Sequence, residues 1–569
     1  SGEGSITMNG TGTQVLKGNG AIGQALSVTK GTLELTGAEG GNGSVTYKSL
    51  TAGSGAHVRL SPVGEGTGAV NTTLTVANGL NLQNSHLDLV INTNRDDLFS
   101  SPVITVQAGD VNLDGTTVSL GSLGDYDDPA DPTANLNFTL VDATGAGTVS
   151  ANGATVDASG YFDFYYQEFG IRTEGGKIVV TGMVKTENAF MDAANTANSE
   201  AGANLLWNNR GNAPKGTQLG DLREAVRNDI QSGNTSRAAR SMAAAAGSTV
   251  NALGTAQKDA LRDQMGWIRN RTTLMGVNPA YVNDDLPRFH MWMEGTGSYA
   301  KLDTRGDESG YQLTTWGGTV GVDADLSDRL TAGAAFTAGY GDLTASAADS
   351  ADGHLDSYYA SLFGRYQNKR WAHTLILTGG WNDAKLNRTV NYGEGSYGTQ
   401  GSTSGWGFGA MYELTYDVYL NENRSSVLQP LFNASVVTTR MDGYEETGAG
   451  NAGLNVGRQD WTTGTLALGG RWMGLVGSNI FGREALAEIR VNAAQDLGDR
   501  RGETNVSLLG NPGFAQSVRG AKTGTTALQL GAGLSVPVGT KGTIYVNGNV
   551  DIRDGSSSVN GSVGYRYDF

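Results

Sequence analysis

The sequence predicts an all-β protein made of two unlike halves with helices between them. Residues 1–185 alternate polar and apolar side chains over runs of about five residues, with a Gly or Asn turn roughly every ten residues. Residues 288–569 alternate over much longer runs. Between these halves, Ser236–Leu274 is rich in Ala and is predicted to be helical. The 85 Gly and 10 Pro, without a Gly-X-Y period, indicate many β-turns and argue against collagen.

Composition excludes several classes of protein. A length of 569 residues allows two or more domains, and the absence of Cys excludes disulfides and thiolate metal sites. A net charge of −16 argues against nucleic acid as a partner, because phosphate binding requires a basic surface. No apolar run reaches the length of about 18 residues that a membrane-spanning helix needs. The first residues, SGEGSITMNG, lack the regions of a signal peptide, so we expect a processed or truncated start.

The first half is expected to be a stack of short strands. A β-sandwich fits, and so does a parallel β-helix in which each coil buries an apolar stripe against its neighbours. The β-helix is favoured because three segments are loosely self-similar: LSVTKGTLEL (26–35), LTVANGLNL (74–82) and ITVQAGDVNL (104–113). Residues 161–184 begin with six aromatic side chains in nine residues and continue through a Gly-Gly turn. We interpret them as a hairpin within a cap at about 159–185, although an ordinary aromatic-rich strand pair would look similar.

The middle of the chain is predicted to be a linker followed by a long helix. Residues 186–235 form the linker, with helical stretches near 204–208 and 216–230. The 39 residues of Ser236–Leu274 would span about 58 Å as one helix, because each residue adds about 1.5 Å. Small side chains suit a narrow pore, but a solvated linker helix explains this segment equally well when it is considered alone. The residues expected in a pore helix are Arg240, Ala243, Ala244, Ala245, Ala246, Asn251, Arg262 and Arg269.

The second half is predicted to be a transmembrane β-barrel. In its last run, Val559, Val563 and Phe569 lie on one face and polar residues lie on the other. Membrane strands need about nine to eleven residues, whereas soluble strands average about five or six. Short turns such as 327–329 and 368–369 alternate with longer polar stretches at 391–403 and 498–522, as outer-membrane barrels require. A soluble sandwich is the alternative, but it would rarely use strands of this length.

We expect twelve antiparallel strands in this barrel. A barrel of eight strands fills its own interior and one of sixteen holds a water channel, so twelve leave room for about one slim helix. Residues 236–275 lie just upstream and could be that helix. This favours their interpretation as a helix inside the pore over a solvated linker helix. The expected strands are 288–302, 310–326, 330–347, 353–368, 371–390, 404–420, 428–441, 460–475, 483–497, 523–537, 542–553 and 557–569.

This order of segments resembles the type Va autotransporters of Gram-negative bacteria. The stack end, aromatic cap, linker, Ala-rich helix and twelve strands follow one another over nearly the whole chain. The last six residues also match the outer-membrane β-signal, Gly-x-x-aromatic-x-Phe, through Gly564, Tyr567 and Phe569. The resemblance implies that residues 1–185 end a β-helical passenger with an autochaperone region. It also implies that residues 288–569 are an outer-membrane translocator whose lumen the linker helix plugs after export.

The same resemblance implies partners and a location. We expect outer-membrane lipid around the barrel, and the barrel assembly machinery and periplasmic chaperones during biogenesis. The passenger would lie at the cell surface or outside the cell, where it could bind host or cell-surface ligands. The protein is expected to be a monomer with no nucleic-acid partner.

No catalytic, cofactor or metal site is predicted. The five His show no metal-binding spacing, and neither a GxSxG elbow nor a P-loop is present, so we expect the protein not to be an enzyme. The acidic stretch 125–132 lacks the spacing of a Ca²⁺ loop and is interpreted as solvated. Some autotransporters cut themselves at an Asn-Asn bond in the pore helix. Here the nearest pair, Asn208 and Asn209, precedes that helix, so we predict no cleavage inside the barrel.

Two other functions remain open from the sequence. In the first, the chain is a surface adhesin whose β-helix is the working part. In the second, it is a plugged porin or channel, and conductance that appears only after deletion of residues 236–275 would separate a sealed translocator from an open pore.

Overall fold

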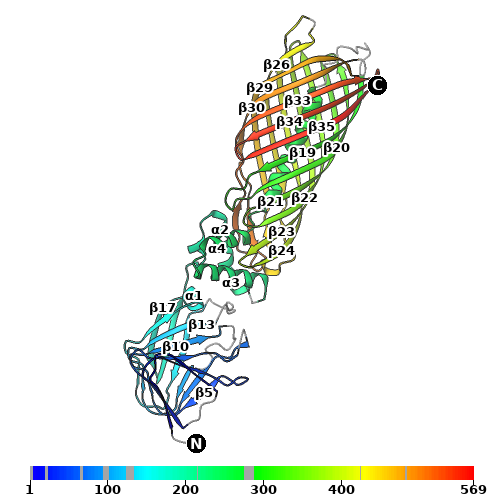
Figure 1. Cartoon of the computed structure of the whole chain (residues 1–569). Helices are drawn as coiled ribbons and strands as arrows, with labels where there is room; N and C mark the ends of the chain where they lie inside the picture. Colours follow the sequence, from blue (N-terminus) through cyan, green and yellow to red (C-terminus); the bar gives the residue numbers. More distant parts are fainter. Residues whose placement is uncertain are drawn as a thin grey trace. The chain divides into compact units, whose positions relative to one another are not determined.

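A computed structural model of the chain describes residues 4–18, 23–64, 68–93, 102–123, 134–213, 216–273, 288–422, 424–480 and 483–569. The chain divides into two compact units (Figure 1). The first unit comprises residues 1–194 and 206–238, and the second comprises residues 195–205 and 239–569. Helices α2 (Ala197–Asn208) and α4 (Thr235–Ala245) therefore contribute residues to both units.

The described residues of the first unit form three sheets of six strands each. From β1 to β16 successive strands go to different sheets, so that each strand pairs with a strand one coil away, as in β4–β7–β10–β13. This parallel arrangement is consistent with a three-sided β-helix. The strands are β1 (Gly4–Met8), β2 (Thr13–Lys17), β3 (Gln24–Val28), β4 (Thr32–Thr36), β5 (Ser44–Tyr47), β6 (Ser49–Ala52), β7 (His57–Leu60), β8 (Thr73–Val76), β9 (Leu80–Asn81), β10 (His86–Ile91), β11 (Ile104–Val106), β12 (Val111–Asn112), β13 (Thr117–Ser122), β14 (Leu136–Asp142), β15 (Val149–Ser150), β16 (Thr155–Ala158), β17 (Tyr166–Glu174) and β18 (Lys177–Val184).

Stacked aliphatic side chains form the core of this unit. Leu33, Val58 and Leu87 are partners in neighbouring parallel strands and are almost completely buried. Each coil therefore removes apolar area from water only because the next coil covers it. The repeated Gly of the self-similar segments has a backbone reason. Gly31 and Gly109 have φ angles of +77° and +80°, which side-chain-bearing residues rarely adopt.

An aromatic helix and an antiparallel hairpin end the parallel stacking. Helix α1 (Tyr161–Tyr165) buries four aromatic rings, where the sequence suggested the start of a hairpin. Strand β18 then pairs antiparallel with β14 and with β17. Strand β17 is an edge strand with a register shift between Gln167 and Gly170 and exposed charges at Arg172 and Glu174. A bulge and charges discourage pairing with another chain.

The predicted single helix from Ser236 to Leu274 is wrong, because two helices cover this region. Helix α4 ends at Ala245 and α5 (Ala252–Thr273) follows after a break in which Gly247 has a φ of +79°. Leu274 lies outside the described residues. The linker contains α2, α3 (Gln218–Gln231) and the 3-10 turns η2 (Met191–Ala193) and η3 (Arg210–Asn212), so it is more helical than expected.

Twelve long strands form an antiparallel barrel in the second unit. Each strand pairs with its neighbour in the chain, β35 pairs with β19, and β24 pairs directly with β26. The two-residue strand β25 (Val418–Tyr419) extends this sheet at one end. The long strands are β19 (Arg288–Leu302), β20 (Gly310–Ser327), β21 (Leu330–Ser346), β22 (Ser350–Asn368), β23 (Trp371–Tyr392), β24 (Gly395–Tyr416), β26 (Ser426–Met441), β29 (Gln459–Ile480), β30 (Arg483–Gly498), β33 (Thr526–Val538), β34 (Gly542–Arg553) and β35 (Ser556–Asp568).

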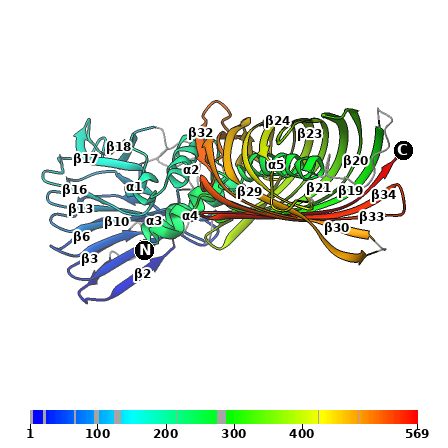
Figure 2. The same ribbon diagram turned by 90° about the horizontal axis from the view of Figure 1, so that it is seen from above.

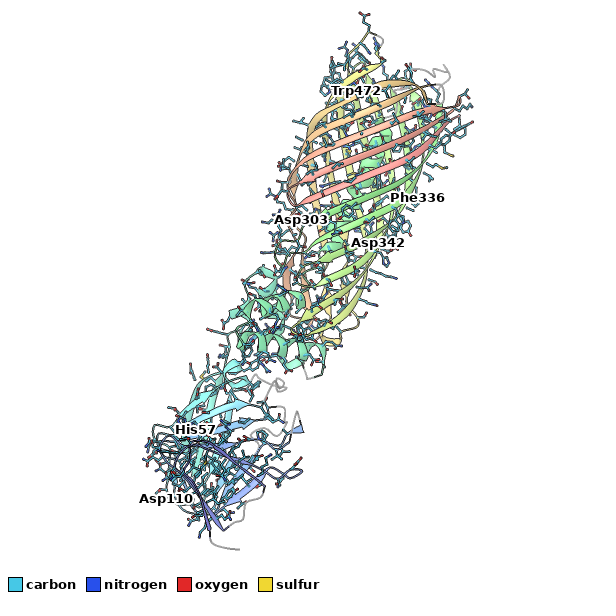
Figure 3. All side chains as sticks on the ribbon, viewed as in Figure 1. His57, Asp110, Asp303, Phe336, Asp342 and Trp472 are labelled. Atoms are coloured by element: carbon cyan, nitrogen blue, oxygen red, sulfur yellow. The ribbon has the colours of Figure 1, made fainter. Side chains whose placement is uncertain are left out.

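The outer surface of the barrel has the pattern of a barrel in lipid. Large apolar side chains such as Phe336, labelled in Figure 3, are half exposed on it. Two belts of aromatic side chains border this apolar band. In β23, Trp371 and Trp381 face outward ten residues apart, a separation that matches the nine to eleven residues of a membrane strand. The register pairs Trp371 with Tyr416 and Trp381 with Trp406, so that the belts continue onto β24.

Two predicted loops are largely strands. Residues 391–403 were expected to form a loop, but β23 and β24 extend through most of them to a tight turn at Gly393 and Glu394. Residues 498–522 contain β31 (Glu503–Leu508) and β32 (Gln516–Arg519). These two strands form a small sheet with β27 (Tyr444–Glu445) and β28 (Leu454–Val456), and η4 (Gly450–Ala452) lies between β27 and β28. The end of the barrel that carries this sheet and the β23–β24 turn is called the rim below.

Candidate functional site

Helix α5 contacts strands from around the barrel and forms the candidate site. It packs against β19–β24, β26 and β29, and its side chains bond to β30 and β35. Figure 2 shows α5 between β20–β24 and the strands from β29 onward. These contacts require α5 to meet the inward faces of the strands, which carry many polar side chains.

Charged side chains join α5 to opposite parts of the barrel. Arg271 donates to Asp323 of β20 across 2.6 Å, and both side chains are fully buried. About two and a half turns away, Arg262 lies 3.1 Å from Asp496 of β30, which also pairs with Arg553 of β34. Removing charges from water is costly, so each buried charge needs its partner. These pairs therefore oppose any position of α5 in which they are separated.

Uncharged polar side chains make further specific contacts. Gln257 Nε2 donates to Asn382 Oδ1 at 3.0 Å, and Gln264 Nε2 donates to Thr337 Oγ1 at 2.8 Å. On another side of the helix, Asn560 Nδ2 of β35 donates to Asp263 Oδ1 at 2.9 Å. A buried polar group without a partner costs about 1–3 kcal/mol, so these bonds select one rotation of the helix.

Glycines of β24 let the helix approach the barrel wall. A Cβ atom added at Gly407 would lie 2.9 Å from Leu261 Cδ2, and one added at Gly409 would lie 3.4 Å from Met265 Cγ and closer still to its sulfur. Leu261 and Met265 are fully buried, with Met411 and other barrel residues in the same apolar cluster. The alternation in WGFGA (406–410) was a usable signal, since every second residue is Gly between outward aromatic rings.

The predicted pore-helix residues occupy several environments. Arg240 is exposed on α4, and the run Ala243–Ala246 is buried at the end of α4 and just beyond it. Asn251 precedes α5 and donates from Nδ2 to the carbonyl of Val518 at 2.9 Å. Arg262 contacts Asp496 as described, and Arg269 is partly exposed on α5. The structure thus brings Asn251, Arg262 and Arg269 to the barrel and leaves Arg240 exposed on α4.

The predicted C-terminal signal residues lie on both faces of the last strand. Gly564 faces inward beneath the ring of Tyr545, where an added Cβ would collide with the tyrosine. Tyr567 and Phe569 are exposed, and their rings meet edge to face with centroids 5.2 Å apart. The backbone N–H of Phe569 donates to the carbonyl of Phe289 at 3.0 Å, which joins the end of the chain to the first strand.

The remaining predicted sites lie elsewhere. Asn208 ends α2 and Asn209 precedes η3, so both belong to the first unit. The acidic stretch 125–132 lies outside the described residues. Within the described ranges, no group of three His, Cys, Asp or Glu side chains is arranged to hold a metal ion. Among the helices that the structure describes, none has the length and apolar character needed to cross a membrane.

Residues 291–549 match the family model described as the autotransporter beta-domain. Esterase EstA of Pseudomonas aeruginosa is 31% identical over 218 residues, which cover 38% of this chain and 32% of the relative. The extracellular serine protease of Serratia marcescens is 29% identical over 105 residues, which cover 18% of this chain and 10% of the relative. The solved translocator domain of the autotransporter NalP from Neisseria meningitidis is 17% identical with a TM-score of 0.41, covering 56% of this chain and 99% of that domain.

These relatives correct one prediction. The sequence offered no catalytic motif, and the expectation that the protein is not an enzyme followed from that absence. The expectation is wrong, because relatives at about 30% identity are named as an esterase and as a serine protease. The chain spans about a third of the length of the esterases it matches, 32% in each case. A motif search confined to this stretch could not exclude an enzyme.

Proposed function

Residues 291–549 are an autotransporter beta-domain in the outer membrane, and on that premise we propose that the barrel exports and displays the chain's own N-terminal half. The observation that carries the proposal is the combination of an apolar outer surface with a polar inner face that a helix contacts on many sides. A membrane protein whose only task is to sit in lipid needs no polar lumen. A protein through which a polypeptide passes does need one, because backbone groups in transit require partners.

We further propose that α5 plugs the pore after export. The buried pairs Arg271–Asp323 and Arg262–Asp496, with the Gln264–Thr337 bond, support this role because they attach the helix to three different strands. A helix about 10 Å across fits a twelve-strand barrel. Removal of α5 is expected to turn a closed barrel into a conducting one.

The stacked coils of the first unit suggest what makes export directional. Each coil that folds outside the membrane buries its aliphatic stripe on the previous coil, as Val58 does on Leu87. Folding therefore opposes backward movement without an external energy source. The hairpin of β17 and β18 would be the first template for stacking, because it lies nearest to the barrel in the sequence and would emerge before the other coils.

We include an enzymatic activity of the whole protein in the proposed function, and assays can test it. Relatives are named as an esterase and as an extracellular serine protease. Hydrolysis of short-chain esters and of peptides should therefore be measured on cells that carry the whole protein. If the activity is lost from the cells when protease removes the displayed part, the exported part carries the activity.

Protease shaving of intact cells tests export, and heat-modifiability tests the barrel. Shaving is expected to remove the N-terminal half and to leave a resistant fragment of α5 plus barrel that migrates differently after boiling. Planar-bilayer recordings of that fragment and of a variant without residues 252–273 complete the test. The proposal fails if shaving leaves the first half intact on sealed cells, or if the deletion variant conducts no more than the fragment.

A further inference from the structure

A set of residues at the rim of the barrel binds the connection between α4 and α5. The bend is defined here as residues 244–254, and the collar as Asp349, Arg388, Glu446, Gln459 and Val518. All of these residues belong to the second unit. The five collar residues come from the β21–β22 turn, β23, the stretch just after β27, β29 and β32. They approach the bend from different parts of the rim.

Arg388 is the centre of the collar. Its Nη1 donates to the carbonyl oxygen of Ala244 at 2.9 Å, near the C-terminus of α4, where a cation is favourable. Its other nitrogens donate to both oxygens of Glu446, Nε at 2.8 Å and Nη2 at 2.6 Å. Asp349 completes the network, with Oδ2 at 3.4 Å from Nη1. All three charged side chains are buried, so the guanidinium is held in one place and presents one donor to the helix end.

Two more contacts recognise the backbone and side chains of the bend. Asp349 Oδ2 accepts from Thr249 Oγ1 at 2.8 Å. Gln459 binds the start of α5 and the chain just before it with the two ends of its amide. Its Oε1 accepts from the N–H of Gly254 in α5, and its Nε2 donates to the carbonyl of Val250, each at 3.0 Å. The first N–H groups of a helix have no partner within the helix, and Gln459 supplies one.

The bend also fits the rim by shape. Gly247 has a positive φ, and an added Cβ would lie 2.6 Å from Leu454 Cδ1. Asn251 packs against Gly502 and Gly520, whose own added Cβ atoms would lie 3.0 and 3.1 Å from Asn251 Cβ. Side chains larger than hydrogen are excluded at these points. The rim is therefore complementary to a bent chain and not to a straight helix.

The backbone of a straight helix matches itself after a shift of one turn, about 5.4 Å, so in a straight plug only side-chain contacts such as Arg271–Asp323 define the resting position. The bend adds a backbone feature that has only one place along the chain. We propose that the collar is the register stop of export: it binds the bend and thereby fixes how far the chain moves before α5 comes to rest. This inference rests on the proposed function and adds the element that sets its end point.

The natural absence of Cys allows the register to be read by engineered disulfides. Met265→Cys with Gly409→Cys reports the native register, since Met265 Cγ lies 3.4 Å from the Cβ position of residue 409. Leu261→Cys with Gly409→Cys reports a helix displaced by one turn away from the rim. Each pair is oxidised in assembled protein, and the crosslinked fraction is measured on gels after cleavage between the two positions.

An insertion of four Ala after Ala256 makes the collar and the lumen contacts compete. If the collar sets the register, the bend stays in place and Leu261 moves opposite Gly409. The 261–409 product is then expected to exceed the 265–409 product at least tenfold. If the lumen contacts set the register, the 265–409 product persists and the inference is overturned.

A second set of variants removes the collar contacts made by Gln459 and Thr249, keeps the contact of Arg388 with the Ala244 carbonyl, and leaves no buried charge alone. In Gln459→Ala with Thr249→Val, the four-Ala insertion is expected to return the 265–409 product to at least half of the total. Gln257→Ala is the matched control, because it removes a Gln from the lumen interface and should leave the 261–409 product dominant. An unchanged ratio in the Gln459→Ala, Thr249→Val variant contradicts the inference. Surface display of the first half is scored in parallel, and its loss in the parent protein would count against the proposed function instead.

Discussion

Removal of the Asp323 carboxylate by Asp323→Ala is expected to destabilise the second unit by about 3–5 kcal/mol, the usual cost of leaving one member of a buried ion pair alone. Arg271 and Asp323 are 0% and 1% exposed, with 2.6 Å between Nη2 and Oδ1. Among the described residues, Nε and Nη1 of Arg271 have no protein partner. The guanidinium therefore has no second acceptor to compensate for the lost carboxylate.

The assay is urea unfolding of the detergent-solubilised protein, followed by tryptophan fluorescence. Trp292 reports locally, because Arg271 lies 5.7 Å above its ring. Asp554→Ala is the matched control. It removes the carboxylate of the exposed Arg305–Asp554 pair, whose Nη2 and Oδ2 atoms are 2.8 Å apart, and should cost less than about 1 kcal/mol because solvent screens it. Arg271→Met with Asp323→Leu should recover most of the loss. Equal losses in Asp323→Ala and Asp554→Ala would refute the reasoning.

Three further predictions follow from single positions. Gly409→Val should lower the free energy of unfolding by about 1–3 kcal/mol, because the added side chain overpacks Met265. Gly464→Val on the lipid side should be nearly neutral in the same urea-unfolding assay. Equal effects of the two substitutions would contradict the close approach of α5 to β24. Burial raises the pKa of Asp349 to about 6, above the unfolded value of about 3.9. Its contribution to stability is thus complete below about pH 4 and lost as the pH rises through about 6, and Asp349→Asn should flatten this part of the stability profile. Phe569→Ala should leave the unfolding of refolded protein within about 0.5 kcal/mol, since the ring is largely exposed, but should lower the amount assembled in the outer membrane; an unchanged amount would refute a role in assembly.

The twelve barrel strands could be predicted because lipid imposes one strict rule on them. Outward residues such as Val559 and Val563 must be apolar and their neighbours face the lumen, which leaves a period of two in the sequence. The rule does not apply to the parts of the strands that extend past the aromatic belt, because lipid does not cover them. Residues 391–403 are polar on both faces, so they read as a loop although β23 and β24 continue through them.

The break between α4 and α5 could not be predicted from local propensity. A single Gly within a helix costs only about 1 kcal/mol, so Gly247 did not distinguish a tolerated residue from a bend. The reason for the bend lies about 100–210 residues away, in Asp349, Leu454 and Gln459. The residues that contact α5 could not be predicted either, because they also lie far away in the sequence. Which strand faces Arg271 depends on the stagger of the barrel, and alternation alone does not define that stagger.

The polar character of the interface between α5 and the barrel fits the proposed order of events. An apolar lumen would hold every apolar segment in transit and would leave each passing backbone group without a partner. A polar lumen lets successive segments exchange one set of hydrogen bonds for another at small net cost. Polar contacts such as Gln264–Thr337 can be exchanged for similar ones as segments pass, so a feature found at one place in the chain defines the end point more sharply. The bend at 244–254 is that feature, because only there do Arg388 and Gln459 meet backbone groups that a continuous helix would have bonded internally.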